Sequence, residues 1–130
     1  MKTLKIGIMA YDRMKERTLA IARGEEKPAS GEPMVWFTSV ESFAKVLSER
    51  NRELLALVAR ENPHSLTELA RLSGRNKSNL SRTLKTMSRC GLVELERGQR
   101  GTLMPRVPYD EVKLDVPITS STRQAAVPPG

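Results

Sequence analysis

Residues 65–96, SLTELARLSGRNKSNLSRTLKTMSRCGLVELE, hold the pattern that most constrains how this chain can fold. Leu80, Leu84 and Met87 recur at the helical period, so they form one apolar stripe on a helix predicted over residues 77–90. At about 100° per residue, most of the polar side chains of this helix turn away from that stripe. This polar side carries hydroxyls, an amide and three cations but no acid, so it suits phosphate oxygens and base edges.

A second helical pattern comes directly before this basic helix. A capping-box signature at Ser65 opens a helix predicted over residues 66–72. The small side chain of Ala70 lets two helices approach closely, and Gly74 permits the turn between them. Leu80 then fills the space between the helices, so the spacing predicts a helix-turn-helix.

A β-hairpin is predicted after the basic helix. Residues 92–96 and 102–104 are strand-like, and the Gly-rich residues 98–101 separate them. Arg97 and Arg100 are expected at the tip of this hairpin. A basic hairpin that follows a basic helix is typical of the wing of a winged helix.

The positive charge is confined to the same part of the chain. The whole chain has 22 Lys and Arg against 15 acids, a net charge of +7. Residues 71–106 hold nine of these cations and two acids, and the thirteen cations and thirteen acids outside this segment cancel. Such a local excess favours a polyanionic partner.

A β-α-β element is predicted at the N-terminus. It consists of a strand over residues 4–8, a helix over 11–23, a loop over 25–33 and a strand over 34–38. An element of this size cannot make an independent core. It must therefore pack on the rest of the chain or on a second copy of itself.

Two aromatic residues of the second strand, Trp36 and Phe37, are the candidate dimer interface. Ordinary core packing against a helix predicted over residues 50–61 is the alternative. A further short helix is predicted over residues 41–47.

These elements predict an α+β fold in three parts. Residues 1–40 form the β-α-β dimerisation element, and residues 41–116 form a winged helix-turn-helix domain that closes with a strand over 112–116. Residues 117–130 contain few large apolar groups, so they are expected to be a disordered tail.

The segment LARLSGRNKSNLSRTLKTMSRCGLVELE resembles the winged helix-turn-helix of MarR-like transcriptional regulators. Over residues 3–116, including the Val-Pro-Tyr-Asp-Glu segment at 107–111, the chain is similar to a family of short bacterial and archaeal DNA-binding proteins. Several members of that family are antitoxins. The resemblance implies DNA binding through residues 75–89 and the wing, with a homodimer as the working form. It also raises an alternative, an antitoxin that binds a small toxin protein as well as its own operator.

The expected DNA contacts divide by chemistry. Ser78, Asn79 and Arg82 are expected to read bases, because Asn can pair with adenine and Arg with guanine. The other cations of the helix and its preceding turn are expected to hold phosphates, and the hairpin arginines the flanking backbone or the minor groove. Asn76 is the expected N-cap, which would turn the helix N-terminus toward a phosphate. The full set of expected DNA-binding residues is Arg75, Asn76, Lys77, Ser78, Asn79, Ser81, Arg82, Lys85, Thr86, Arg89, Arg97 and Arg100.

Three other classes of function find less support in the sequence. His64 is the only histidine and has no neighbouring Cys or carboxylate pair, so neither a catalytic residue, a metal site nor a cofactor is expected. Acids on the basic helix would have favoured a protein-interaction module, and there are none. The basic stretch also lacks the aromatic residues on which single-stranded RNA stacks.

The cellular location expected from the sequence is the cytoplasm of a prokaryotic type of cell. The single cysteine, Cys90, cannot form an internal disulfide, and it is expected to be a small buried apolar residue. No run of 18 apolar residues and no signal peptide is apparent, so no membrane contact is expected. The sequence thus predicts a double-stranded-DNA-binding transcriptional regulator, an autoregulatory repressor and not an enzyme.

Overall fold

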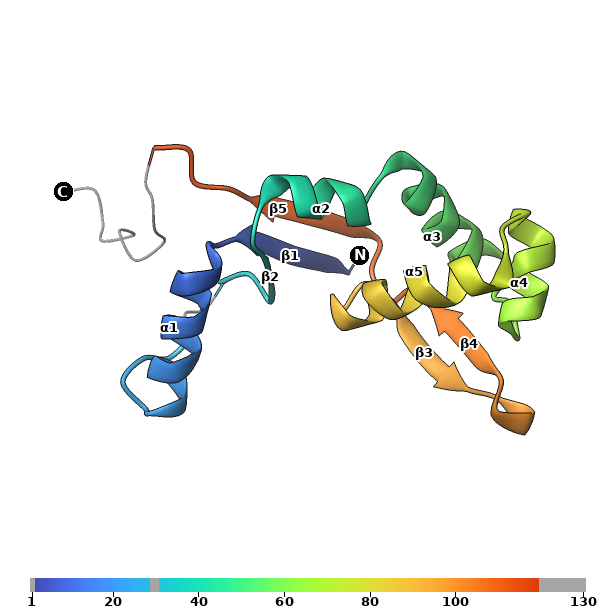
Figure 1. Ribbon diagram of the computed structural model, residues 1–130, viewed down its shortest axis with the longest axis horizontal. Helices are drawn as coiled ribbons and strands as arrows, with labels where there is room; N and C mark the ends of the chain where they lie inside the picture. The colour runs from blue at the N-terminus through green and yellow to red at the C-terminus, as the bar shows by residue number, and fades with distance from the viewer. Residues whose placement is uncertain (1, 29–30, 120–130) are drawn as a thin grey trace. The chain divides into compact units, whose positions relative to one another are not determined.

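A computed structural model describes residues 2–28 and 31–119 of the chain (Figure 1). The chain forms two compact units. The helical unit is Ala44–Asp110 together with the start of the chain, and the sheet unit joins Thr3–Phe43 to the segment that begins at Glu111. Both units contain helices and β-strands, which confirms the α+β class.

The helical unit contains the predicted helices and hairpin. Its elements are α3 (Glu49–Glu61), α4 (Leu66–Ser73), α5 (Lys77–Arg89), β3 (Glu94–Arg97) and β4 (Leu103–Arg106). Strands β3 and β4 are antiparallel, and a short 3-10 turn, Gln99–Gly101, joins them. Residues Leu92 and Val93, which were expected to begin the first strand, are buried but precede it.

The apolar stripe of α5 is in the core, as predicted. Leu80, Leu84 and Met87 are each at most 1% exposed. Burying one such side chain contributes about 1.5–3 kcal/mol, so the rotation of α5 about its axis is set by these three residues. Other buried apolar side chains of the unit are Leu54, Val58, Pro63, Leu66, Leu69, Leu92, Val93 and Pro105.

Helix α4 and the turn that follows it have the capping residues that the sequence predicts. Ser65 caps α4, because its hydroxyl accepts a hydrogen bond from the Glu68 backbone N–H at 3.0 Å. Gly74 ends the helix at φ 73°, a left-handed conformation that glycine adopts without a Cβ clash. Its N–H donates to the Ala70 carbonyl at 2.9 Å. Because α4 ends at Ser73 and α5 begins at Lys77, only three residues, 74–76, lie between the helices.

The sheet unit confirms the β-α-β element. Strands β1 (Thr3–Ile8) and β2 (Val35–Phe37) are parallel, and helix α1 (Tyr11–Ala22) lies between them in the chain. The short helix α2 (Val40–Val46) follows β2.

Strand β5 (Glu111–Asp115) corrects the predicted domain boundary. The sequence placed it in the domain 41–116, but it pairs in parallel with β1, and the sheet order is β2-β1-β5. Alternation of apolar residues predicts a strand but not its partner, because a strand pairs with whichever edge matches its register. The helical unit therefore ends at Asp110, and β5 belongs with the N-terminal strands.

The aromatic residues predicted as a candidate dimer interface make contacts within the sheet unit. Trp36 lies against Gly7, where an added Cβ would be only 2.5 Å from the Trp36 ring. Arg17 of α1 stacks on that ring at 5.5 Å from its centroid. Phe37 is 8% exposed and meets Phe43 edge-on, with ring centroids 5.6 Å apart. Trp36 and Phe37 therefore contribute to the packing of this unit.

Two further findings concern the ends and surface of the chain. Residues 117–119 are the only part of the expected tail that the structure describes, so the prediction for 120–130 lies outside the described residues. Within the described ranges, no helix is both long enough and apolar enough to cross a membrane.

Candidate nucleic-acid interface

Helix α5 begins at a side-chain cap. The Asn76 side-chain carbonyl accepts hydrogen bonds from the backbone N–H groups of Ser78, at 2.7 Å, and Asn79, at 3.3 Å. This confirms Asn76 as the N-cap. It also means that these two N–H groups are already satisfied, so the helix end would act on an anion through its partial positive charge more than through them.

The solvent side of α5 carries the polar residues expected there. Exposed side chains are Asn76, Lys77, Ser78, Asn79, Arg82, Lys85, Thr86 and Arg89. Ser81 is half-buried, so it lies at the border between this side and the core. The Thr86 hydroxyl donates to the Arg82 carbonyl at 3.1 Å, which leaves its lone pairs but not its proton for a ligand.

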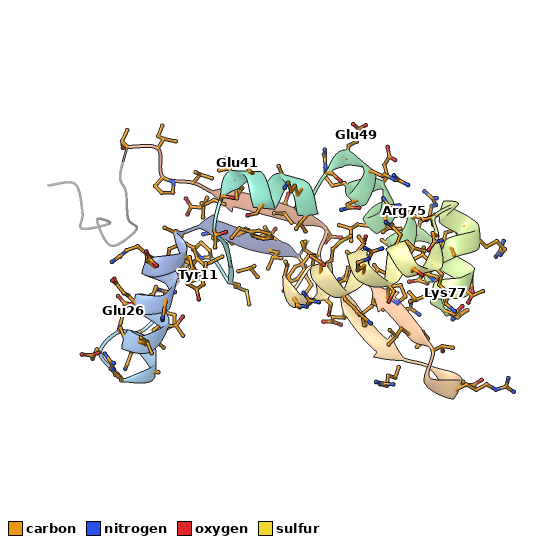
Figure 2. The ribbon with its side chains drawn as sticks, in the orientation of Figure 1. Tyr11, Glu26, Glu41, Glu49, Arg75 and Lys77 are labelled. Carbon is orange, nitrogen blue, oxygen red and sulfur yellow. The ribbon has the colours of Figure 1, made fainter. Side chains whose placement is uncertain are left out.

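Arg75 differs from the other predicted phosphate contacts. Its guanidinium donates to the Asn51 side-chain oxygen at 3.2 Å and to the Arg50 carbonyl at 2.8 Å. Arg75 is labelled in Figure 2. Burial lowers the pKa of Arg75, Arg50 lowers it further and Glu53 opposes this. The group stays charged at neutral pH, because the ordinary pKa of arginine lies far above 7.

These bonds give Arg75 a structural role that the sequence did not predict. They join the turn before α5 to the first turn of α3. Asn51, the partner 24 residues away, also donates to the Val46 carbonyl at 3.0 Å. These bonds add a role in positioning α5, and the phosphate contact of Arg75 stays a prediction.

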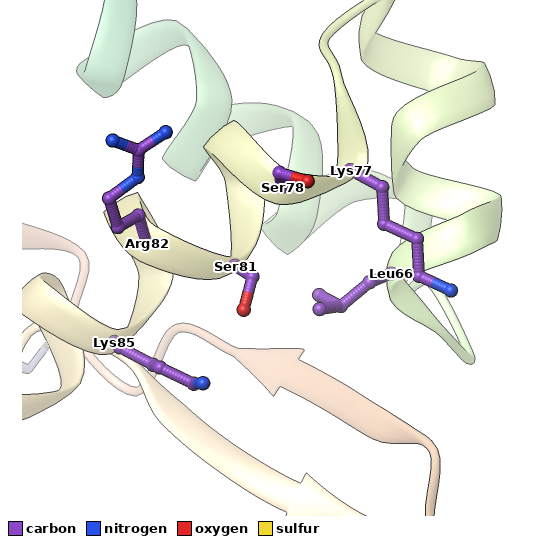
Figure 3. A pocket seen from close by; sticks show the side chains of 6 residues that line it. All are labelled: Leu66, Lys77, Ser78, Ser81, Arg82 and Lys85. Carbon is purple, nitrogen blue, oxygen red and sulfur yellow. The ribbon is translucent and has the colours of Figure 1, made fainter.

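The first two turns of α5 border an open hollow. It has a volume of about 420 Å³, and its lining residues are Leu66, Lys77, Ser78, Ser81, Arg82 and Lys85. Figure 3 shows the Ser81 hydroxyl and the Lys85 ammonium projecting to the same side of α5, with Lys77 extended beside Leu66 of α4. The Arg82 guanidinium points away from Ser81 in this view. Three cations and two hydroxyls without an acid favour an anionic ligand here.

The cations of α5 and the hairpin have no carboxylate within 4.0 Å in the described part of the chain. They are Lys77, Arg82, Lys85, Arg89, Arg97 and Arg100. Ion pairs among the described residues join α1 to itself and to the loop before β2, and others lie just after α1 and at the end of α3. The positive charge of the interface is thus not neutralised by side chains of the described residues.

The hairpin adds two of these exposed cations. Arg100 is at the tip, where it has φ 59° in the 3-10 turn. Arg97, also expected at the tip, is the last residue of β3 and pairs with Leu103. The turn is closed by the Gly98 N–H, which donates to the Thr102 carbonyl at 2.7 Å. A tight turn of this kind holds Arg100 out into solvent.

The chain has one histidine and one cysteine, His64 and Cys90. His64 is exposed. Within the described residues, no group of three or more His, Cys, Asp or Glu could hold a metal ion. Cys90 is half-buried, whereas the sequence predicts a buried residue. Burial raises the pKa of its thiol and Arg89 partly opposes this, so the thiol is protonated at neutral pH.

Comparison with known proteins places the chain in a family. The family model HVO_A0114 matches residues 46–114, more than half of the chain. No curated protein and no solved structure matches this chain. The matched region takes in α3, α4, α5, the β3–β4 hairpin and most of β5. The chain therefore belongs to the HVO_A0114 family.

Proposed function

We propose that this protein is a sequence-specific transcriptional regulator that binds double-stranded DNA through a winged helix-turn-helix. In this proposal α5 enters the major groove, which is wide enough to admit an α-helix, and the β3–β4 hairpin is the wing that contacts the flanking backbone. One observation carries the proposal. The exposed cations of α5 and the hairpin have no carboxylate partner among the described residues, and three core residues hold α5 in one orientation.

The exposed residues of α5 suit a division between base and phosphate contacts. Asn79 and Arg82 have side chains that can make two parallel hydrogen bonds to a base edge, and Ser78 can make one. Lys77, Lys85 and Arg89 suit phosphates, because an ammonium or guanidinium there neutralises charge whatever the sequence. Arg97 and Arg100 are assigned to the DNA beside the groove.

A homodimer is part of the proposal. A single copy that neutralises about six phosphates would bind DNA weakly and with little discrimination at physiological salt. Two copies related by a twofold axis would read two half-sites about 10–10.5 base pairs apart, or multiples of that distance. The promoter of the protein's own gene is the first operator to test, because autoregulatory repression is the mode of action proposed.

Fluorescence anisotropy titrations would test DNA binding directly. The probes are a duplex from the gene's own promoter and a scrambled duplex of equal length and composition, at several salt concentrations. For about six phosphates per copy, log K should fall with log salt at a slope near −5 per bound copy. Specific binding should exceed binding to the scrambled duplex by about 10³-fold or more. A flat salt dependence would contradict DNA binding, and equal affinity for both duplexes would contradict regulation of this promoter.

A further inference from the structure

The sheet unit exposes apolar side chains that the helical unit does not. Among the described residues, the large hydrophobic side chains that are exposed all belong to the sheet unit. They are Tyr11, Leu19, Met34, Val40, Leu114 and Ile118. Parallel sheets are normally covered on both faces and flanked by other strands. This three-stranded sheet is therefore an incomplete structure that a partner could extend.

Strand β5 is an open edge of that sheet. It pairs with β1 on one side, and no described strand pairs with it on the other. Leu4 is opposite Val112 and Ile6 is opposite Leu114, so the members of each pair lie on the same face. Leu4 and Ile6 are 1% and 0% exposed, but Leu114 is 37% exposed. The apolar face of the sheet thus continues to the edge and is uncovered there, which is a template for another strand.

We propose that this edge is the homodimer interface, where β5 pairs antiparallel with β5 of a second copy about a twofold axis at Leu114. Leu114 then faces the partner's Leu114, and Val112 faces the partner's Val116. Lys113 faces the partner's Asp115 twice, once on each side of the axis. Since side chains alternate between faces, the apolar pairs extend the apolar face and the ion pairs lie on the other face.

Other antiparallel registers are less complementary. An axis at Lys113 brings Lys113 onto the partner's Lys113 and Glu111 onto the partner's Asp115, which are like charges. An axis at Val112 pairs Glu111 with the partner's Lys113, but it places Leu114 against the partner's Asp110. Cross-strand pairs of like charge destabilise a sheet, and so the register at Leu114 is favoured.

The sequence also limits the length of the paired segment. In the register at Leu114, Pro117 faces the partner's Glu111. Proline has no backbone N–H to donate, so the ladder ends there. The paired segment is therefore short, and we expect a reversible dimer whose population depends on concentration.

This inference deepens the dimer of the proposed function, and a charge swap tests it. Sedimentation of the full chain should show a wild-type dimer. Lys113→Asp or Asp115→Lys alone should weaken dimerisation at least about tenfold, because each creates two repulsive pairs. The double variant Lys113→Asp/Asp115→Lys should restore it. An equimolar mixture of the two single variants should form a heterodimer, since each then supplies the charge that the other needs.

A cross-link gives a second measurement that does not depend on charge. In a Cys90→Ser background, Leu114→Cys should form an intermolecular disulfide on oxidation. Residues directly opposite each other in an antiparallel pair have Cα atoms about 4.5–5.5 Å apart, within the range that a disulfide spans. Lys113→Cys is the matched control and should cross-link much less, because it faces the partner's Asp115 and not itself.

Several results would overturn the interface. One is a wild-type protein that stays monomeric at hundreds of micromolar. Another is a double swap that fails to restore the dimer while the folded state, followed by circular dichroism, is intact. Rescue of Lys113→Glu by Glu111→Lys would assign the register at Val112 instead. Binding of a single half-site duplex is measured in parallel, so that failure of the interface and failure of DNA binding are distinguished.

Discussion

At the scale of single residues, the cations of this protein divide into those that the fold holds and those that solvent surrounds. Arg75 donates to Asn51 and to the Arg50 carbonyl, and Arg106 donates to the Pro63 carbonyl at 2.9 Å. Lys85 and Arg82 are exposed and have no carboxylate partner in the part of the chain that is described. Substitutions in the two groups should therefore affect different measurements.

Arg75→Ala should destabilise the folded protein. It removes charge-assisted hydrogen bonds from a half-buried guanidinium, so we expect the free energy of unfolding to fall by about 1.5–3 kcal/mol. Lys85→Ala is the control and should change it by less than about 0.5 kcal/mol. Urea denaturation measures both. In a double-mutant cycle, Asn51→Ala should add less to Arg75→Ala than it costs alone, and strictly additive losses would contradict the contact.

Arg82→Ala and Lys85→Ala should alter DNA binding in different ways. If Arg82 reads a base, its loss should cost about 1–3 kcal/mol of binding free energy and relax the preference at one position. If Lys85 holds a phosphate, its loss should weaken all duplexes alike and reduce the magnitude of the salt slope by about 1. Selection from a random duplex pool followed by anisotropy measures both effects. If Arg82→Ala instead lowers the affinity for all duplexes equally, Arg82 contacts the DNA backbone and not a base.

At the scale of elements, Asn76 caps the N-terminus of α5 and is also part of the proposed DNA-binding surface. Asn76→Ala should lower the free energy of unfolding by about 1 kcal/mol, because two backbone N–H groups lose their acceptor. Asn76→Asp should keep the cap and interact favourably with the helix dipole, but it brings an anion toward the phosphates. Thermal melting combined with anisotropy should thus show a stable variant with weakened DNA binding. Wild-type affinity in Asn76→Asp would contradict the placement of this helix end at DNA.

At the scale of the whole molecule, dimerisation and DNA binding should be separable. Lys113→Asp alters no residue proposed to contact DNA, so its affinity for a single half-site should stay within about threefold of wild type. Its affinity for a duplex with two half-sites should fall toward that single-site value, because the second site is no longer held in place. Paired titrations of the two duplexes measure this. The double variant Lys113→Asp/Asp115→Lys has the wild-type net charge and should recover, whereas equal losses on both duplexes would point to simple charge repulsion.

Much of the helical unit could be predicted because its determinants are local. The period of Leu80, Leu84 and Met87, the cap at Asn76 and the left-handed turn at Gly74 each depend on residues within a few positions. The exposure of Lys77, Arg82, Lys85 and Arg89 then follows from burial of the opposite stripe. The exact ends of the two hairpin strands could not be predicted from the sequence. Arg97 lies in β3, because it pairs with Leu103 and only residues 98–102 connect the two strands.

The sequence alone determined the identity and order of the helices and strands, the apolar stripe of α5 and the confinement of positive charge to one segment. Only the tertiary structure decided which distant groups meet. It paired β5 with β1, where the Thr3 hydroxyl donates a hydrogen bond to the side chain of Glu111, which is 108 residues away in the sequence. It also brought Arg75 into hydrogen-bond contact with Asn51 and packed Trp36 on Gly7. The physical reason is the distance along the sequence over which each interaction acts. Helix period, caps and turns depend on neighbours along the chain, whereas strand partners and side-chain hydrogen bonds depend on which surfaces the folded core brings together.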